Sequence, residues 1–258
     1  MATTYVLIVI IYNLIIQSAC AVPQFSHGRV VGRISSESVY DVSGCAASRV
    51  HPGVLYVHND HGDSARIFAL DRNTAKVVGE FLISGARNND WEDIAVGPCD
   101  WADARSCIYI LDGGSADEYP GYENTVYRVV EPDRMNITQL PVDSSLQYRW
   151  TARSSGTIMV DEEANVFIIA EGHGLNNMIV QLPSAAWGST SAVFLQSDSM
   201  YGVSQSRKGP LGGDISADGT EILESDWGEA VCWSADGKYY YTLAEGHYQL
   251  LFEYMRLN

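Results

Sequence analysis

Short apolar runs separated by turn residues dominate the chain. In residues 228–246 a small apolar run, an Asp-Gly turn and an aromatic, β-branched run follow one another. Two such runs joined by Asp-Gly predict a β-hairpin. The same order of small apolar run, turn and second apolar run recurs upstream, at 44–62, 91–113, 156–172 and 213–223. The chain is therefore expected to be built from repeated hairpins.

Each hairpin is followed by further strand-like segments. Third runs occur at 66–70, 126–129, 179–182 and 251–254, and residues 76–83 add a fourth run to the first unit. Four-stranded units at a spacing of ~40–50 residues predict an all-β fold, a β-propeller of about five to six blades. The units that begin at 213 and 228 are too close for a whole blade, so one blade is expected to be truncated near 224–227. Residues 29–34 are expected to form a strand that completes the last blade.

The first residues resemble a targeting segment. Residues 1–21 contain no charged side chain and are mostly apolar, and Ala19 and Ala21 are the small residues that a signal peptidase reads. We expect a signal peptide over 1–21 and a secreted, single-domain mature chain over 22–258, with no membrane attachment after cleavage. In a secreted chain the sequon at Asn136 is expected to carry a glycan.

The charge balance limits the partners. The chain has 32 acidic and 16 basic residues, a net charge of −16. This balance argues against nucleic acid or an anionic membrane as a partner, because both attract basic surfaces. It fits cations, basic partners, or simply a soluble extracellular surface. Apolar residues make up 46% of the chain, which is enough for a sizeable core.

Four cysteines remain once Cys20 leaves with the signal peptide. An even number in a secreted chain predicts disulfides. Cys99 and Cys107 bracket one loop inside a hairpin and are the expected first pair. By subtraction, Cys45 pairs with Cys232, on the first strands of the first and last repeats, which are neighbours if the propeller closes into a ring.

Acidic residues recur at the front of several first strands. In a propeller the first strand of each blade lines the central channel, so acids at its front end converge on one mouth. Crowded carboxylates and amide oxygens suit Ca²⁺, which takes six to eight oxygen ligands. The alternative is that these side chains cap turns by accepting backbone N–H bonds. The candidate calcium ligands are Asp93, Asp214 and Glu229, joined by Asn59, Asp60 and Asp112 from neighbouring turns.

Residues 58–63, HNDHGD, form the densest polar cluster in the chain. Beside a metal ion, His58 or His61 could act as general base for attack of water on an ester, a lactone or a phosphoester. The alternative is a solvent-facing turn whose histidines are satisfied by hydrogen bonds. No serine lies in a nucleophile-elbow context, and no glycine-rich phosphate loop is present in the sequence.

Several motifs together resemble a known family. They are HND-x-GD in 58–63, DWEDIAVGP in 90–98, VYRVVEP in 126–132, GGDISADG in 212–219 and GEAVCWSADG in 228–237. The chain resembles a mostly uncharacterised family of secreted β-propeller proteins from bacteria and marine invertebrates. More distantly it is similar to six-bladed calcium propellers such as the gluconolactonase, paraoxonase and phytase-like hydrolases.

The resemblance implies that the motif acids Asp93, Asp214 and Glu229 surround the channel. Two departures stand out. Family members usually carry an acid at the head of the third repeat, where this chain has Gly156. About 30 residues that family members have before Trp227 are missing here.

Together these observations favour a secreted, acidic, calcium-binding propeller that acts as an extracellular binding or matrix component. The alternative is a calcium-dependent hydrolase, an esterase, lactonase or phosphoesterase with its site at the channel mouth. The first function implies calcium and the extracellular matrix as partners, and the second implies calcium and a small-molecule substrate.

Overall fold

The structure is a computed structural model. It describes residues 23–114, 123–149, 154–171, 178–195, 200–203, 210–225 and 230–258. The predicted signal peptide lies outside the described residues, so secretion stays a prediction. Within the described residues, no helix is long and apolar enough to cross a membrane.

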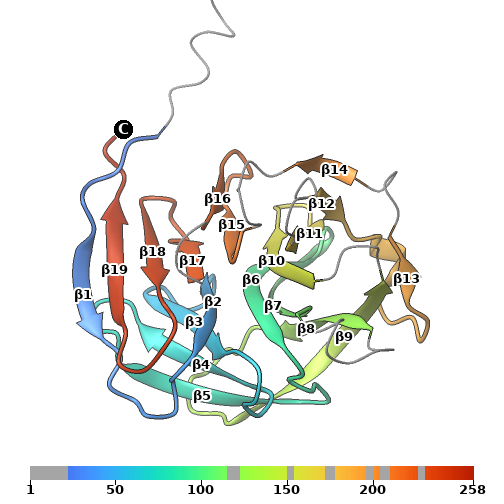
Figure 1. The fold of residues 1–258 in the computed structure, drawn as a ribbon, viewed down its shortest axis with the longest axis horizontal. Helices are drawn as coiled ribbons and strands as arrows, with labels where there is room; N and C mark the ends of the chain where they lie inside the picture. Colours follow the sequence, from blue (N-terminus) through green and yellow to red (C-terminus); the bar gives the residue numbers. More distant parts are fainter. Residues whose placement is uncertain are drawn as a thin grey trace, which may run out of the picture.

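The strands group into blades that follow one another along the chain (Figure 1). Blade 1 consists of β2 (Val42–Ala47), β3 (Val54–Asn59), β4 (Arg66–Asp71) and β5 (Val77–Ser84). Blade 2 consists of β6 (Trp91–Asp100), β7 (Asp103–Asp112), β8 (Asn124–Val130) and β9 (Gln139–Arg149). Blade 3 consists of β10 (Ser154–Val160), β11 (Val166–Glu171), β12 (Met178–Gln181) and β14 (Met200–Val203).

The remaining blades are unequal. Blade 4 has two strands among the described residues, β15 (Gly213–Ile215) and β16 (Ile222–Glu224). Blade 5 consists of β17 (Ala230–Trp233), β18 (Tyr239–Leu243), β19 (Leu250–Met255) and the N-terminal β1 (Arg29–Arg33). A short 3-10 helix (Ser184–Ala186) and β13 (Val193–Phe194), which runs parallel to β9, come between β12 and β14 of blade 3 in sequence. The truncation predicted near 224–227 agrees with this two-stranded sheet, since only five residues separate the end of β16 from the start of β17.

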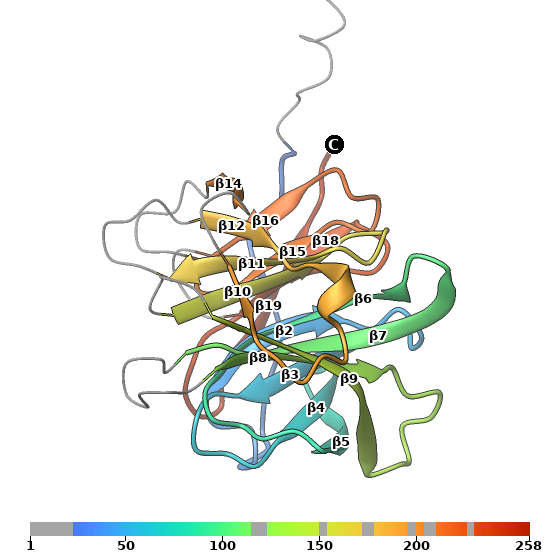
Figure 2. The ribbon, with the colours of Figure 1, turned by 90° about the vertical axis from the view of Figure 1, so that its right-hand side faces the viewer.

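The first strands of the blades form a closed ring. β2 contacts β6, β6 contacts β10, β10 contacts β15, β15 contacts β17, and β17 contacts β2. The sequence prediction of an all-β propeller is thus confirmed, and the described strands make five blades, at the lower end of the expected number. In the side view, blade 3 lies above the strands of blades 1 and 2 (Figure 2).

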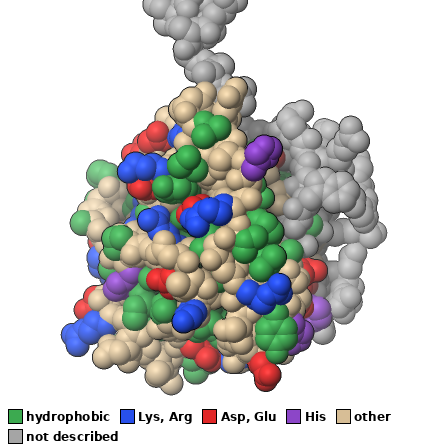
Figure 3. All heavy atoms as spheres, turned by 90° about the vertical axis from the view of Figure 1, so that its left-hand side faces the viewer, with side chains coloured by type: hydrophobic (Ala, Val, Ile, Leu, Met, Phe, Trp, Pro, Cys, Tyr) green, Lys and Arg blue, Asp and Glu red, His purple; other side chains and the backbone are tan. Residues whose placement is uncertain are grey.

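The N-terminal strand completes the last blade, as its sequence predicts. β1 pairs antiparallel with β19, with Arg29 opposite Glu253 and Val30 opposite Phe252. The two strands lie side by side at one edge of the molecule (Figure 1). On this edge basic and acidic side chains are intermixed (Figure 3), and Arg29 pairs with Glu253 at 2.6 Å. This face therefore carries both signs of charge despite the surplus of acids.

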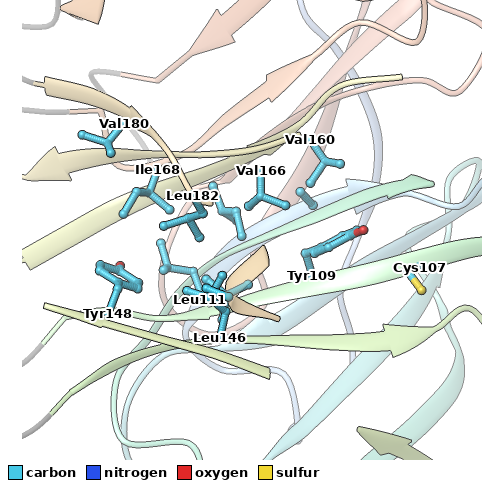
Figure 4. Packing of buried hydrophobic residues seen from close by; sticks show 14 of the residues in the cluster. Cys107, Tyr109, Leu111, Leu146, Tyr148, Val160, Val166, Ile168, Val180 and Leu182 are labelled. Atoms are coloured by element: carbon cyan, nitrogen blue, oxygen red, sulfur yellow. The ribbon is translucent and has the colours of Figure 1, made fainter. Parts of the chain in front are cut away.

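The core lies in the seams between neighbouring blades. Alternate residues of a strand face opposite sides of a sheet, so each blade presents an apolar face to each neighbour. Between blades 2 and 3, Tyr109 and Leu111 pack with Ile168 and Val180 (Figure 4). Burial of such side chains contributes roughly 1.5–3 kcal/mol each.

The cysteines fall into two kinds of pair. Cys99 and Cys107 form a disulfide across β6 and β7, which confirms that prediction. Cys45 of β2 and Cys232 of β17 are buried free thiols whose Sγ atoms lie 2.9 Å apart. The structure therefore brings together the second predicted pair, at the seam where the ring closes, and the bond itself stays a prediction. Asn136 is exposed, and its glycan also stays a prediction.

Candidate functional site

Asp93 binds the backbone of three blades. A register shift between Trp91 and Asp93 marks a β-bulge at the start of β6. The Asp93 side chain is completely buried, and its Oδ1 accepts a 2.8 Å hydrogen bond from the amide of Ile94. Its Oδ2 accepts hydrogen bonds from two backbone amides, that of Ile158 in blade 3 at 3.0 Å and that of Gly213 in blade 4 at 3.3 Å. One carboxylate thus links three inner strands.

Asp214 makes the equivalent link to blade 5. Its Oδ2 accepts the amide of Trp233 at 2.9 Å. Burial raises the pKa of Asp214 to about 7. Burial also raises the pKa of Asp93 well above its ordinary value, and the nearby charge of Asp214 adds to that rise. The sequence prediction that these two acids converge agrees with this geometry, but backbone amides already occupy the described carboxylate oxygens.

Asn59 and Asp112 hold turns at matching positions, opposite the starts of β2 and β6. The Oδ1 of Asn59 accepts the amides of Tyr40 and Asp41, at 3.0 and 3.2 Å. The Oδ1 of Asp112 accepts the amide of Asp90 at 2.9 Å, and burial raises the Asp112 pKa to about 6. Both side chains thus act in the way that the turn-capping alternative predicted. Glu229 lies outside the described residues, and its role stays a prediction.

A different group of side chains has the geometry of a metal site. Among the described residues, ligand atoms of Asp60, His61 and Asp90 all lie within 4.8 Å of one another. We call these three residues the acid–histidine cluster. His61 Nδ1 lies 3.4 Å from Asp60 Oδ2 and 3.9 Å from Asp90 Oδ1. Asp60 and His61 come from the turn between β3 and β4, and Asp90 comes from the turn before β6.

The surroundings of Asp60 disfavour the negative charge of its carboxylate. Asp60 Oδ1 is buried and has no hydrogen-bond partner among the described residues. Burial raises the pKa of Asp60 to about 6, and the charge of Asp90 adds to that rise. The hydrogen bond to Asp60 raises the pKa of His61. An unpaired buried oxygen beside a second carboxylate is costly unless a proton or a cation offsets the charge.

Glu92 lies beside this cluster. A Cβ atom on Gly114 would lie 2.0 Å from Glu92 Oε1 and 2.2 Å from Asp90 Oδ2, so both oxygens crowd the space that a glycine leaves free. Glu92 Oε1 is therefore close to Asp90, but Glu92 is not one of the three residues of the cluster. Neither Asp90 nor Glu92 is among the ligands predicted from the sequence. The signal that could have found them is the run DWED at 90–93, in which three of four residues are acids.

The two histidines of the HNDHGD segment have different environments. His58 is fully buried, its Nδ1 lies 3.0 Å from the carbonyl oxygen of Asn59, and its ring meets Trp91 edge-on. Burial lowers the pKa of His58 to about 4. A side chain without exposed surface cannot take a proton from a substrate at the mouth, so His58 is corrected from a candidate base to a core residue. The His61 side chain is 70% exposed.

Comparisons with known proteins identify neither a family nor a function for this chain. No family model and no curated protein matches the chain. It is similar to the PQQ-bound aldose sugar dehydrogenase of Streptomyces coelicolor, at 13% identity and a TM-score of 0.49, over 92% of this chain and 99% of that one. It is also similar to a protein of unknown function from Bacteroides thetaiotaomicron, at 13% identity and a TM-score of 0.38, over 88% of this chain and 50% of that one. Neither likeness is close enough to carry a function over.

Proposed function

We propose that this chain is a secreted propeller that binds a divalent cation at the acid–histidine cluster. The observation that carries the proposal is the convergence of Asp60, His61 and Asp90 to within 4.8 Å, from turns of two neighbouring blades. Ligand atoms about 2.4 Å from one ion fall within such a distance of each other. We therefore propose that the cation binds at this cluster and not at the acids of the channel.

Calcium is the proposed ion because carboxylate oxygens dominate. Asp60 and Asp90 supply them directly, and the carboxylate of Glu92 lies close to that of Asp90. Hard oxygen ligands favour Ca²⁺, whereas an imidazole nitrogen favours ions such as Zn²⁺ or Mn²⁺. A bound cation would offset the negative charge of the Asp60 carboxylate, whose buried Oδ1 has no hydrogen-bond partner among the described residues.

The proposed setting is extracellular, as a binding or matrix component. The uncharged segment 1–21 supports secretion. The Cys99–Cys107 disulfide supports it too, because disulfides persist mainly in oxidising compartments. The hydrolase alternative loses His58, and His61 is assigned to the cation, so no observation of its own favours it.

The test is calcium-dependent stability of the mature chain, 22–258. Thermal unfolding is measured in EDTA and in Ca²⁺ for the wild type and for Asp60→Asn and Asp90→Asn, with the exposed Asp133→Asn as matched control. Ligand at 100 times its Kd stabilises the folded state by about 2.7 kcal/mol. We expect calcium to raise the Tm of the wild type and of Asp133→Asn, and to leave the Tm of both cluster variants unchanged.

Two results would overturn the assignment. Either Tm does not respond to millimolar Ca²⁺, Zn²⁺ or Mn²⁺, or the response persists in both cluster variants, which would place the ion elsewhere. The Tm response of the variant His61→Gln distinguishes calcium from a transition metal. Loss of a Zn²⁺ or Mn²⁺ response in this variant, with no Ca²⁺ response in the wild type, would replace calcium by a transition metal.

A further inference from the structure

A polar groove of about 530 Å³ lies between the β5–β6 connection and the outer strands of blade 2. This volume is within the range of about 300–1,000 Å³ that small-molecule sites occupy. Amide and hydroxyl side chains make up most of its lining, namely Asn89, Thr125, Tyr127, Ser145 and Gln147. The lining is therefore unlike the mostly apolar wall of a typical pocket.

The sheet register builds one wall of the groove. Thr125 of β8 lies opposite Gln147 of β9, and Tyr127 lies opposite Ser145. Because alternate residues of a strand share a face, these four side chains lie on the same side of the sheet. The wall thus presents two opposed pairs of hydrogen-bonding groups, held by a regular β-ladder.

The connection before β6 builds the other wall and is fixed in place. The Trp91 indole donates a 2.8 Å hydrogen bond to the Arg87 carbonyl oxygen, and the Asn89 amide donates a 2.6 Å bond to Asp112. The Arg87 amide donates to the Tyr127 hydroxyl at 3.4 Å. Both walls are tied to blade 2, so a ligand would meet a site that is already formed.

Several groups of the groove have hydrogen-bonding capacity that the described protein does not use. The side chains of Ser145 and Gln147 are half-buried and make no hydrogen bond to another described residue. The Arg87 guanidinium has no carboxylate partner among the described residues, in a chain with 32 acids and 16 basic residues. Glu123, at the groove edge, is paired with Arg149.

We propose that this groove binds a saccharide. Amides and hydroxyls both donate and accept hydrogen bonds, and sugar hydroxyls have the same dual character. The scarcity of apolar lining disfavours a lipid or an apolar peptide, and one guanidinium is too little positive charge for nucleic acid. Arg87 pairs with a carboxylate of the sugar, because a guanidinium binds that group through two parallel hydrogen bonds. The preferred ligand is accordingly a uronate-containing oligosaccharide.

The experiment is calorimetric titration of the mature chain with two probes, digalacturonate and the neutral disaccharide maltose. The variants are Gln147→Leu, Ser145→Ala and Arg87→Gln. The matched control is Gln139→Leu, an exposed position on the same strand outside the groove. Each titration is run in EDTA and repeated in calcium, so that failure of the cation site does not affect the result.

We expect digalacturonate to bind more tightly than maltose. Gln147→Leu and Ser145→Ala should each weaken binding about fivefold to tenfold, the usual effect of one hydrogen bond. Arg87→Gln should abolish the preference for the acidic probe, and Gln139→Leu should bind as the wild type does. If neither probe binds at millimolar concentration, the proposal is wrong. Binding that Gln147→Leu and Ser145→Ala leave unchanged, with Tm preserved, overturns it as well.

Discussion

The seam between blades 1 and 5 should be closed covalently in the oxidised protein. Cys45 and Cys232 are buried on neighbouring inner strands, with their sulfur atoms 2.9 Å apart. We predict that these two thiols are oxidised while the chain folds, before the seam buries them, by exchange with a small-molecule disulfide such as oxidised glutathione. One protein disulfide forms, and two glutathione thiols are released.

The expected stabilisation follows from the length of the loop that the bond closes. The two cysteines are 187 residues apart in sequence, whereas Cys99 and Cys107 are 8 apart. In the chain-entropy model the longer loop is worth about 5 kcal/mol and the shorter one about 2.5 kcal/mol. Most of the disulfide stabilisation should therefore come from the bond that closes the ring.

The assay isolates this bond in a Cys99→Ala, Cys107→Ala background. Urea unfolding is measured with and without reductant, and peptides are mapped under non-reducing conditions. Reduction should lower the free energy of unfolding by about 5 kcal/mol. A Cys45→Ala, Cys232→Ala variant with Cys99 and Cys107 intact serves as control. Free, alkylatable Cys45 and Cys232 in protein purified without reductant and then unfolded would refute the reasoning.

Three further predictions concern the channel. Asp93→Ala should cost roughly 3 kcal/mol by urea unfolding, because it leaves buried amides of blades 3 and 4 without an acceptor; Asp236→Ala, in an exposed turn, should cost under 1 kcal/mol. Asp214 alone should lower wild-type stability by at most about 4 kcal/mol as pH rises from 4 to 7, because its folded-state pKa is about 7; Asp214→Asn should make that fall smaller, and an unchanged slope would contradict the burial argument. Gly44→Ala should cost about 1–3 kcal/mol, since its Cβ would lie 2.7 Å from His58 Nε2; unaltered Tm would show that the seam can relax.

The fold could be predicted because its signals are local. Apolar runs and turns such as Asp236-Gly237 define hairpins without any knowledge of distant residues. The close spacing of residues 213 and 228 revealed the short blade in the same way. Completion of the last blade by β1 followed from a single strand-like run with no partner of its own.

The candidate site could be predicted only in part. The convergence of Asp93 and Asp214 followed from their matching positions on first strands. The sequence does not show which backbone amides donate hydrogen bonds to these carboxylates, because those amides belong to other blades. The meeting of His61 with Asp90 depends on the shapes of two turns, which hydrophobic patterning does not encode. Burial of His58 depends on Trp91, which packs against it from the neighbouring blade.

The place of β1 in blade 5 determines the order in which the molecule can be completed. β1 leaves the ribosome before any other described strand, yet its partner β19 ends at Met255, and all the other described strands lie between them in sequence. Blade 5 therefore cannot be completed until β19 has been synthesised. Pairing of such remote segments is slow, because the entropy of closing a long loop is lost before its contacts form. Until then β1 has no partner strand, and its unpaired edge is a hazard for aggregation.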